Sequence, residues 1–299
     1  MFDNDYIENL IKNPKEISKL DTSVISEIIN QALIKFRQED MLIELQTEGN
    51  KDEIYVFGDI HGNLDSLLRL LDLVKQNKPK YIIFLGDIVD RGPKQSECLV
   101  IILALKINNP NRFYLLRGNH ESIDMNKSYG FYQEFITKFC NYDKFTEIGE
   151  LYHSIPICVI VDEKILCVHG GIPENLDILN EIRNLKKKKI SKEKLMKILM
   201  NVFQMMWNDP KKSIKGFKDS IRGPGSKFFG KDVFDEFMNK NNLDYLIRSH
   251  EVFQEGYKFF FDDQLLSIFS SANYRGKKFS NPASYAIIRN KKIHAKILK

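Results

Sequence analysis

EIYVFGDIHGNLDSLLRLLDLVKQ, residues 53–76, is the stretch that decides the fold. It predicts a short apolar strand that ends in Gly-Asp, followed from Leu64 by apolar residues at the 3.6-residue period of a helix. The same order recurs downstream, where YIIFLGD (81–87) predicts a strand, SECLVIILALKI (96–107) a buried helix and RFYLLRGN (112–119) a third strand. Strands that alternate with helices indicate a largely parallel sheet in this half of the chain.

The rest of the chain predicts helices before this unit and further strands after it. Residues 1–48 are helical in pattern, because SVISEIINQALIKF (23–36) places its apolar residues at helical spacing. ICVIVDEKILCVHGG (157–171) predicts two strands joined by an Asp-Glu-Lys turn, and residues 174–206 are mostly helical in pattern. Four more strands are expected, the last two joined by a tight turn around Asn290: LDYLIRSH, LLSIFSS, SYAIIRN and KIHAKIL.

Length and composition fit one globular domain with a substantial core. The chain has 299 residues, of which 43% are hydrophobic and 28% charged, and these proportions are typical of an ordinary soluble globular protein. It shows no internal repeat or flexible linker. Residues 49–299 are therefore predicted to form one compact domain, with the helical residues 1–48 packed on it.

Neither a membrane anchor nor an oxidising compartment is indicated. The longest apolar run, Cys98–Leu105, is too short to span a bilayer, and the N-terminal MFDNDYIENL lacks the basic-then-apolar order of a secretion signal. The four cysteines form no CxxC pair, and three of them lie in apolar stretches. We therefore expect free, buried thiols in a protein of the cytoplasm, the nucleus or both.

Much of the net charge of +5 comes from one lysine-rich stretch, NLKKKKISKEKLMK (184–197). A solvent-exposed helix face or loop is the first interpretation of such a run. Binding to nucleic acid or to an acidic partner is the alternative, but no aromatic residues interleave with these lysines, as they do on surfaces that bind single-stranded nucleic acid. No nucleic-acid partner is therefore expected.

Metal-binding or proton-transferring residues follow five of the predicted strands, usually beside glycine. Ligands and catalytic groups of α/β sheets gather beyond the carboxyl ends of strands, and glycine lets the backbone turn there and bring a short side chain close to an ion. Four of the six histidines fall in these strand ends, whereas His153 and His294 have no such neighbours and are interpreted as structural. The five strand ends are GDIHG (58–62), GDIVDRG (86–92), RGNHE (117–121), HGG (169–171) and RSHE (248–251).

The donors at these strand ends suit a pair of metal ions. Hard oxygen ligands mixed with imidazoles, without thiolates, fit Mn, Fe or Zn in a two-metal site better than a structural zinc site. Asp87, central in the order of the motifs, is the natural carboxylate to bridge two cations that would otherwise repel each other. Within RGNHE alone, Asn119, His120 and Glu121 could each bind a metal, and His120 could instead transfer a proton.

A two-metal site of this kind points to phosphoryl transfer. Two metal ions clamp a phosphoryl group and deprotonate a bridging water for in-line attack. Arginine adds a bidentate grip on phosphate oxygens, because its planar guanidinium matches their geometry. The candidates are Arg91, which follows Asp90 in GDIVDRG, and Arg222, in the glycine-containing loop SIRGPGSKFFG.

The motifs GDxHG, GDxVDRG and GNHE, in this order, resemble those of the phosphoprotein phosphatase family of serine/threonine phosphatases, in the metallophosphoesterase superfamily. The resemblance runs from about Glu53 to the last strand and extends through WNDP (207–210), IRGPGSKFFG, LIRSHE and SSANYRG. ESIDMNKSYGF and NNLDYLIRSHEVFQEGY are closest to the type-5 and EF-hand-bearing subgroups. The chain contains neither the tetratricopeptide repeats nor the calcium-binding loops of those relatives, so regulation by such modules is not implied.

The resemblance implies a fold and a ligand set. Relatives have a four-layer α/β sandwich in which helices flank two central mixed β-sheets, and residues 49–299 are expected to form this catalytic domain. Two divalent metal ions are implied, with manganese expected in the recombinant protein and iron or zinc as alternatives. Their ligands would come from six residues with Asp87 shared: Asp59, His61 and Asp87 for one ion, and Asp87, Asn119, His169 and His250 for the other.

The resemblance also implies roles around the phosphate. His120 would be the proton donor to the leaving alkoxide rather than a ligand, Asp90 would hydrogen-bond to its imidazole, and Glu121 would have a structural or supporting role. The implied reaction is hydrolysis of phosphoserine and phosphothreonine esters by in-line attack of a metal-bridging hydroxide, with no phosphoenzyme intermediate. The residues expected to hold or line the phosphate site are Arg91, Arg222, Asn119 and Tyr274.

The resemblance implies phosphoproteins as substrates and regulatory proteins as partners. The catalytic core is expected to be a monomer. A hydrolase of small phosphoesters or dinucleoside polyphosphates is the alternative within the superfamily, and a binding module without activity is an alternative of another class. The loops around Trp207, Arg222 and Tyr274 favour a protein phosphatase over the first alternative. The presence of every expected ligand and of both arginines argues against the second.

The chain departs from the family pattern in the lysine-rich, helical stretch after HGG, where contacts to substrates or partners do not carry over, and in one loop. SSANYRG lacks the proline of the family's Ser-Ala-Pro-Asn-Tyr sequence, so the conformation of this loop does not carry over. Arg275, in the same loop, stands where many relatives have cysteine. This arginine is expected to add positive charge at the rim of the site and to prevent capture by cysteine-directed toxins.

Overall fold

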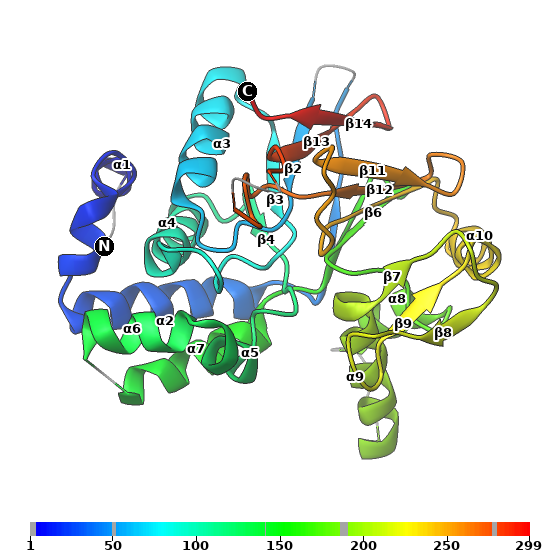
Figure 1. The fold of residues 1–299 in the computed structure, drawn as a ribbon, viewed down its shortest axis with the longest axis horizontal. Helices are drawn as coiled ribbons and strands as arrows, with labels where there is room; N and C mark the ends of the chain where they lie inside the picture. Colours follow the sequence, from blue (N-terminus) through cyan, green and yellow to red (C-terminus); the bar gives the residue numbers. More distant parts are fainter. Residues whose placement is uncertain (1–3, 50–51, 141, 186–190, 277–279) are drawn as a thin grey trace.

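The three strands of the opening motifs lie side by side in a five-stranded sheet of order β14-β13-β2-β3-β4 (Figure 1). β2, β3 and β4 are parallel, as the alternation of strands and helices predicted, whereas β13 runs antiparallel to β2 and β14. The β13–β14 turn has Asn290 and Lys291 in the left-handed conformation that two-residue hairpins favour. The strands are β2 (Ile54–Phe57), β3 (Tyr81–Phe84), β4 (Phe113–Leu115), β13 (Ser284–Arg289) and β14 (Lys292–Ile297).

A six-stranded sheet of order β1-β5-β6-β10-β12-β11 carries the later motifs. Its pairs β1–β5, β6–β10 and β10–β12 are parallel, and β5–β6 and β11–β12 are antiparallel. The sheet is therefore mixed, like the first. Its strands are β1 (Leu42–Leu45), β5 (Cys158–Val161), β6 (Ile165–Val168), β10 (Tyr245–Arg248), β11 (Tyr257–Phe260) and β12 (Leu265–Ile268).

The two sheets pack face to face and helices lie on the outer side of each, which gives four layers. Alternate residues of a strand therefore belong to different cores. In β2, Val56 belongs to the core between the two sheets, as does Ile247 of β10, whereas Phe57 belongs to the core on the side of the helices. In β6, Cys167 joins the core between the sheets and Leu166 faces the helices of the other side. Because side chains of a strand point alternately to its two faces, one apolar strand can serve two cores.

Helices cover both outer faces (Figure 1). The computed structural model describes residues 4–49, 52–140, 142–185, 191–276 and 280–299. Against the five-stranded sheet and its core lie α1 (Asn4–Lys12), η1 (Pro14–Lys19), α2 (Thr22–Gln38), α3 (Leu64–Asn77), α4 (Gln95–Asn108), α5 (Ile123–Tyr129), α6 (Phe131–Phe139) and α7 (Tyr142–Ser154). Beside the six-stranded sheet lie α8 (Ile178–Arg183), α9 (Lys192–Trp207) and α10 (Lys231–Lys240).

The prediction that residues 1–48 are helical is wrong for Leu42–Leu45. These residues form β1, which pairs in parallel with β5 at the edge of the six-stranded sheet. Leu42 and Leu45 are buried, a three-residue spacing that a helix would also show, so the pattern did not separate the two structures. These residues form a strand rather than a helix because the backbone groups at the edge of β5 supply hydrogen-bond partners that a strand can reach.

Several smaller elements were not predicted from the sequence. They include β11, α10 and a three-stranded sheet of order β7-β9-β8. This sheet holds the segment that follows Trp207 beside the loop that carries Arg222. Its strands are β7 (Asp209–Pro210), β8 (Phe217–Asp219) and β9 (Lys227–Phe229).

Cys98, Cys158 and Cys167 are buried free thiols, as expected, and Cys140 is exposed. Among the helices that the structure describes, none combines the length and apolar character needed to cross a membrane. Of the lysine-rich stretch, residues 186–190 lie outside the described residues, and residues 192–197 form the first turns of α9.

Candidate active site

The predicted site residues meet at one edge of the two sheets, on turns that directly follow β2, β3, β4, β6 and β10. Several of these residues have left-handed backbone conformations that side chains other than glycine rarely adopt. The φ angles are 46° at His61, 52° at Asp87, 68° at Asp90, 75° at Arg91 and 73° at His250. Such conformations gather at functional sites, where the surrounding structure holds them in place.

Glycine brings the turns after β3 and β4 into contact. Gly86 has a φ of 102°, and a side chain there would collide with the backbone of Gly118. A side chain on Gly118 would in turn collide with Asp87. The glycines of GDIVDRG and RGNHE therefore allow the carboxylate of one motif to lie directly beside the other motif.

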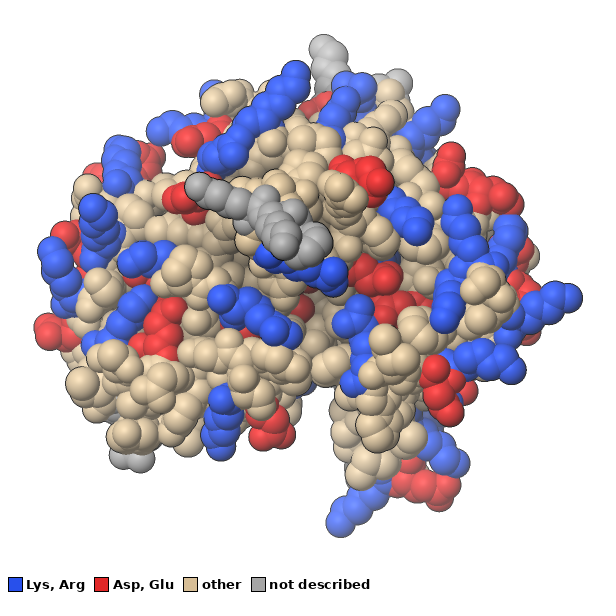
Figure 2. All heavy atoms as spheres, viewed as in Figure 1, with Lys and Arg blue, Asp and Glu red and all other residues tan. Residues whose placement is uncertain are grey.

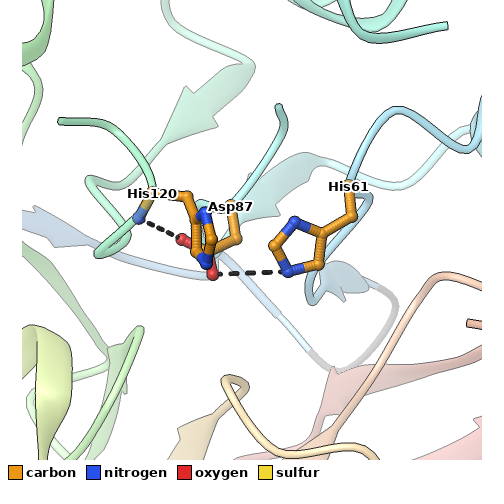
Figure 3. A group of neighbouring side chains, drawn as sticks. All are labelled: His61, Asp87 and His120. Carbon is orange, nitrogen blue, oxygen red and sulfur yellow. Dashed lines mark hydrogen bonds and ion pairs between the residues drawn. The ribbon is translucent and has the colours of Figure 1, made fainter. Parts of the chain in front are cut away.

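One group of candidate metal ligands lies beside the carboxylate of Asp87, and Figure 3 shows His61 of this group next to that carboxylate. His61 Nε2 lies 3.6 Å from Asp87 Oδ2 and 3.6 Å from Asp59 Oδ2. The other ring nitrogen, His61 Nδ1, lies 2.9 Å from the carbonyl oxygen of Val89 and so donates its hydrogen there. Burial lowers the pKa of His61, which favours the neutral ring. A neutral His61 therefore directs an unprotonated nitrogen at two carboxylates.

A second group of donors lies on the other side of Asp87. His169 Nδ1 lies 2.9 Å from the carbonyl oxygen of Leu85, which leaves Nε2 as the inward-facing atom. This Nε2 lies 2.9 Å from Asn119 Oδ1, 3.1 Å from His250 Nδ1 and 3.4 Å from Asp87 Oδ2. Burial opposes protonation of His169, but the Asp87 carboxylate outweighs it and raises the pKa of this histidine. The pocket thus favours a positive charge at this point.

These donors fit divalent metal ions. Geometry alone places His61, Asp87 and His120 within reach of one ion, and Asp87, His169 and His250 within reach of another. Among the described residues, His250 Nε2 is buried without a hydrogen-bond partner, and the ring makes its polar contact through Nδ1, inside the cluster. Carboxylate, amide and imidazole groups that converge in this way can direct their lone pairs at a divalent cation.

Asp87 belongs to both groups, as the bridging prediction requires. Its Oδ1 accepts a hydrogen bond from the backbone N–H of His120 at 2.8 Å, so the carboxylate is held in one orientation (Figure 3). Burial would raise the pKa of Asp87, but His169, His120 and His61 outweigh it and hold this pKa well below its usual range. The carboxylate is therefore charged and faces three imidazoles.

Asp59 is fixed by donors from the other sheet. Its Oδ1 accepts hydrogen bonds from the Ser249 hydroxyl and, at 3.1 Å, from the backbone N–H of His250. The Ser249 hydroxyl also accepts from the Asp59 backbone N–H at 2.9 Å. The oxygen that remains, Oδ2, is the one that faces His61. The turns after β2 and β10 are thereby joined across the two sheets.

His120 is held through its outer nitrogen. Its Nδ1 lies 2.7 Å from Asp90 Oδ2, as the resemblance implied, so Nε2 is left for other contacts. Asn126 donates to the same Asp90 oxygen at 3.0 Å and to the His120 carbonyl at 2.8 Å, and the Tyr152 hydroxyl donates to Asn126 Oδ1 at 2.9 Å. Burial lowers the pKa of His120, but Asp87 and Asp90 outweigh it and raise that pKa. The sequence had not indicated Asn126 or Tyr152 as part of the site.

Glu121 lies behind the site and joins two turns. Its carboxylate accepts hydrogen bonds from the backbone N–H groups of Asp87, Ile88 and Gly118, at 2.8, 2.9 and 2.8 Å. Burial and the nearby Asp87 charge raise its pKa to about 7. These contacts agree with the structural role expected of Glu121.

Above these donors lies a cavity of about 860 Å³, lined by His61, His120 and His250 at its base. Its rim includes Trp207, Tyr274 and Arg275. A more apolar cavity of about 630 Å³ lies between α1, α3 and α4, but it contains none of the expected ligands. We therefore take the first cavity as the candidate active site.

Both predicted arginines line this cavity, and each is held by a neighbour. The Arg91 guanidinium lies 3.9 Å from the centre of the Tyr129 ring, a cation–π contact. Arg222 donates from Nε to the buried carboxylate of Asp209, which also pairs with Arg248 at 2.7 Å. The sequence had not indicated Asp209 as the anchor of Arg222.

The loop that departs from the family pattern has its own anchors. Tyr274 stacks on His61, with 5.1 Å between ring centres and 23° between planes. Ala272, at the position of the family's proline, donates its backbone N–H to Ser66 Oγ at 3.1 Å, a bond that proline could not form. Asn63 donates to the Ala272 carbonyl at 2.9 Å. Arg275 is exposed at the cavity rim.

Residues 53–254 match the sequence profile of the calcineurin-like phosphoesterases. The chain belongs to the calcineurin-like phosphoesterase family. The matched region contains all six expected metal ligands, and membership of the family implies divalent metal ions for this phosphoesterase.

Solved structures agree with this assignment. A protein serine/threonine phosphatase from Saccharomyces cerevisiae, described as similar to human phosphatase PP5, matches with 28% identity and a TM-score of 0.78 over 92% of this chain and 90% of its own. A cold-active protein-tyrosine phosphatase of a psychrophilic Shewanella species matches with 18% identity and a TM-score of 0.59 over 86% of this chain and 81% of its own, which shows the fold alone. The predicted phosphoprotein phosphatase family and the four-layer fold are thus confirmed, and the chain is a metal-dependent phosphatase.

Proposed function

We propose that this phosphatase is a serine/threonine protein phosphatase that hydrolyses phosphoserine and phosphothreonine esters with two divalent metal ions. One observation carries the proposal: two groups of metal-binding donors meet at Asp87, and the imidazole of His120, hydrogen-bonded to Asp90, lies beside them. The 28% identity to a yeast protein serine/threonine phosphatase supports the same substrate class.

The two ions would share Asp87, and their ligands are the six residues named from the sequence. When bound, such ions draw electron density from the phosphoryl oxygens and lower the pKa of a coordinated water toward neutrality. Manganese, iron and zinc all suit this set of oxygen and imidazole donors, and we propose manganese for the recombinant protein. One ion would take Asp59, His61 and Asp87, and the other Asp87, Asn119, His169 and His250.

Arg91, Arg222 and Asn119 would bind the phosphate of the substrate. The stacking of Arg91 on Tyr129 and the pairing of Arg222 with Asp209 hold both guanidinium groups before substrate arrives. Groups that are already ordered lose less conformational entropy on binding, so more of the binding free energy orients the phosphate. Tyr274, stacked on His61, closes one side of the site.

His120 would protonate the leaving group. As a hydroxide derived from water bonds to phosphorus, the bond between phosphorus and the serine or threonine oxygen breaks. The electron pair of that bond stays on the serine or threonine oxygen, which takes a proton from His120 Nε2. Asp90, 2.7 Å from Nδ1, orients the ring and favours its protonated form. Geometry alone would allow His120 to be a metal ligand with His61 and Asp87, but an imidazole fixed by a carboxylate suits proton transfer, and Asp59 supplies the missing donor.

The experiment that tests the proposal is phosphopeptide turnover after chelation and re-addition of single metals. We expect turnover of phosphoserine and phosphothreonine peptides to disappear on chelation and to return with manganese. Turnover of a dinucleoside tetraphosphate in preference to any phosphopeptide would instead favour the hydrolase of small phosphoesters. A protein that binds two metal ions and turns over neither substrate would contradict both.

A further inference from the structure

Helix α9 exposes a group of large apolar side chains outside the catalytic cavity. Met196 is 61% exposed, Leu199 50% and Met200 62%, although Ile198 and Val202 on the other face of the same helix are buried. Figures 1 and 2 show α9 as an arm that projects from the body of the molecule. A helix that buries one face and leaves a second apolar face in solvent has a surface suited to a binding partner.

The exposed residues continue along the helix to the active site. Met196, Met200, Phe203 and Trp207 are spaced by four, three and four residues, so they lie on one face of α9. Phe203 stacks on Trp207, with 5.6 Å between ring centres and 22° between planes. Trp207 lines the catalytic cavity and contacts the ring of His250 edge-on at 5.8 Å. An apolar surface therefore leads out of the cavity along α9.

We define the α9 stripe as Met196, Leu199, Met200 and Phe203. From Trp207 to Met196 the helix rises about 16 Å at 1.5 Å per residue. An extended peptide covers that length with about five residues. A chain whose phosphorylated residue sits in the cavity can thus place its neighbouring residues along the α9 stripe.

The charges near the stripe select the chemistry of its partner. α9 exposes Lys192, Lys194 and Lys197. Lys194 pairs with Glu181 of α8 at 3.4 Å, and Lys197 pairs with Glu193 of the same helix at 2.8 Å. Because these lysines are exposed, such pairs are weak and the carboxylates of a partner can compete for them. At the other end of the stripe, the cavity rim carries arginines, including Arg275. A segment with apolar and acidic side chains complements this surface. A second copy of the chain would instead bring two basic helices together.

We propose that the α9 stripe binds an apolar, acidic segment of the phosphoprotein substrate that flanks the phosphorylated residue. This inference rests on the proposed function and names the substrate class more closely. Two of the four residues are methionines, whose flexible side chains adapt to different partners, so several substrate sequences can bind.

The test uses the full chain loaded with manganese and the double variant M196Q/M200Q. Glutamine is close to methionine in shape and helix propensity, so α9 should still form. The probes are two peptides in which Leu and Glu residues lie four to eight positions before or after a phosphoserine, a third with Gly and Ser at those positions, and an aryl phosphate. The control variant is Ile34→Gln on α2, because Ile34 is similarly exposed, at 54%.

We expect M196Q/M200Q to raise KM by about 5- to 10-fold for at least one of the two Leu/Glu peptides, which corresponds to about 1 kcal/mol of binding free energy. kcat for that peptide, and turnover of the Gly/Ser peptide and of the aryl phosphate, should stay within about 2-fold. Ile34→Gln should change none of these values.

Other outcomes overturn the inference and separate its failure from that of the proposed function. Equal KM values for variant and wild type on every peptide would exclude the α9 stripe and leave the proposed function standing. Turnover of the aryl phosphate without turnover of any phosphopeptide would contradict the proposed function itself. Unchanged KM values with a loss of self-association in light scattering, or of binding to anionic phosphatidylserine vesicles, would assign the stripe to a second copy or to a membrane.

Discussion

The floor and the rim of the catalytic cavity are built in different ways. On the floor, Asp87 and His169 are no more than 1% exposed and sit on short turns with several fixed hydrogen bonds. At the rim, Ile221 is 94% exposed, Arg275 is exposed, and α9 projects into solvent. Buried turns therefore hold the proposed metal ligands and proton donor in place, whereas exposed residues at the rim can vary without disturbing them.

Among substitutions in the floor, Asp87→Asn is expected to have the largest effect. An amide carries no charge to offset two cations, so we expect loss of bound metal and a fall in aryl phosphate turnover of about 10⁴-fold or more. Metal content would be measured by mass spectrometry after gel filtration. Asp162→Asn changes another buried carboxylate, in the β5–β6 turn, and should keep both metal and activity. Retention of two ions by Asp87→Asn would contradict the shared position.

His120→Asn separates chemistry from metal binding within the same floor. We expect normal metal content and a fall in phosphoserine peptide turnover of about 10²- to 10⁴-fold, the usual contribution of a general acid. The fall should be smaller for aryl phosphates, because their leaving groups need little protonation. His294→Asn, on β14, is the matched control and should change neither metal content nor turnover. Equal losses on the two substrate types would remove His120 from the role of proton donor.

The three arginines test whether the contribution of a residue to phosphate binding falls from the floor of the cavity to its rim. Arg222, paired with the buried Asp209, should lose about 10- to 100-fold in kcat/KM when replaced by alanine, because charged hydrogen bonds contribute about 1.5–3 kcal/mol. Arg91→Ala should show a similar loss. Arg275→Ala should lose no more than about 2- to 3-fold, because solvent screens an exposed charge. A change confined to thermal stability in all three would exclude phosphate binding.

The mildest test is Tyr152→Phe, behind the floor. It removes the hydroxyl that donates to Asn126 and should lower the free energy of unfolding by about 1–3 kcal/mol. Because Asn126 also holds Asp90, phosphopeptide turnover should fall by up to about 10-fold. Urea unfolding and turnover would be measured together. Tyr114→Phe removes a comparable hydrogen bond, to Asn111, and should lower stability alone. Matching turnover in the two variants would show that Tyr152 has no positioning role.

The residues of the cavity floor could be predicted from sequence, because each lies close in sequence to a strand that is visible in the apolar pattern. Asp59, Asp87 and His169 each lie within three residues of the end of a strand with a readable apolar pattern. Parallel strands direct their carboxyl ends to the same edge, so the sequence order of the motifs is enough to expect that they meet. The resemblance to a known family then assigned the roles that spacing left open, such as the choice between ligand and acid for His120.

The remaining features depend on partners that lie far along the chain. Asn126 is 36 residues from Asp90, and Tyr152 is 26 residues from Asn126. Nothing in the local pattern of either residue marks it as part of the site. β1 was missed for the same reason, because its strand conformation depends on the edge of β5 rather than on its own four residues.

The hydrogen bond between the Asp59 backbone and Ser249 joins residues 190 positions apart. During synthesis, the carboxylates of GDIHG and GDIVDRG therefore leave the ribosome long before His250 can complete the second group of donors. Until then a partial chain presents clustered negative charge, unpaired strand edges and incomplete cores, the conditions under which nascent chains aggregate or need chaperones. Metal capture is thus expected late in the maturation of this phosphatase, after the last third of the chain has folded onto the first.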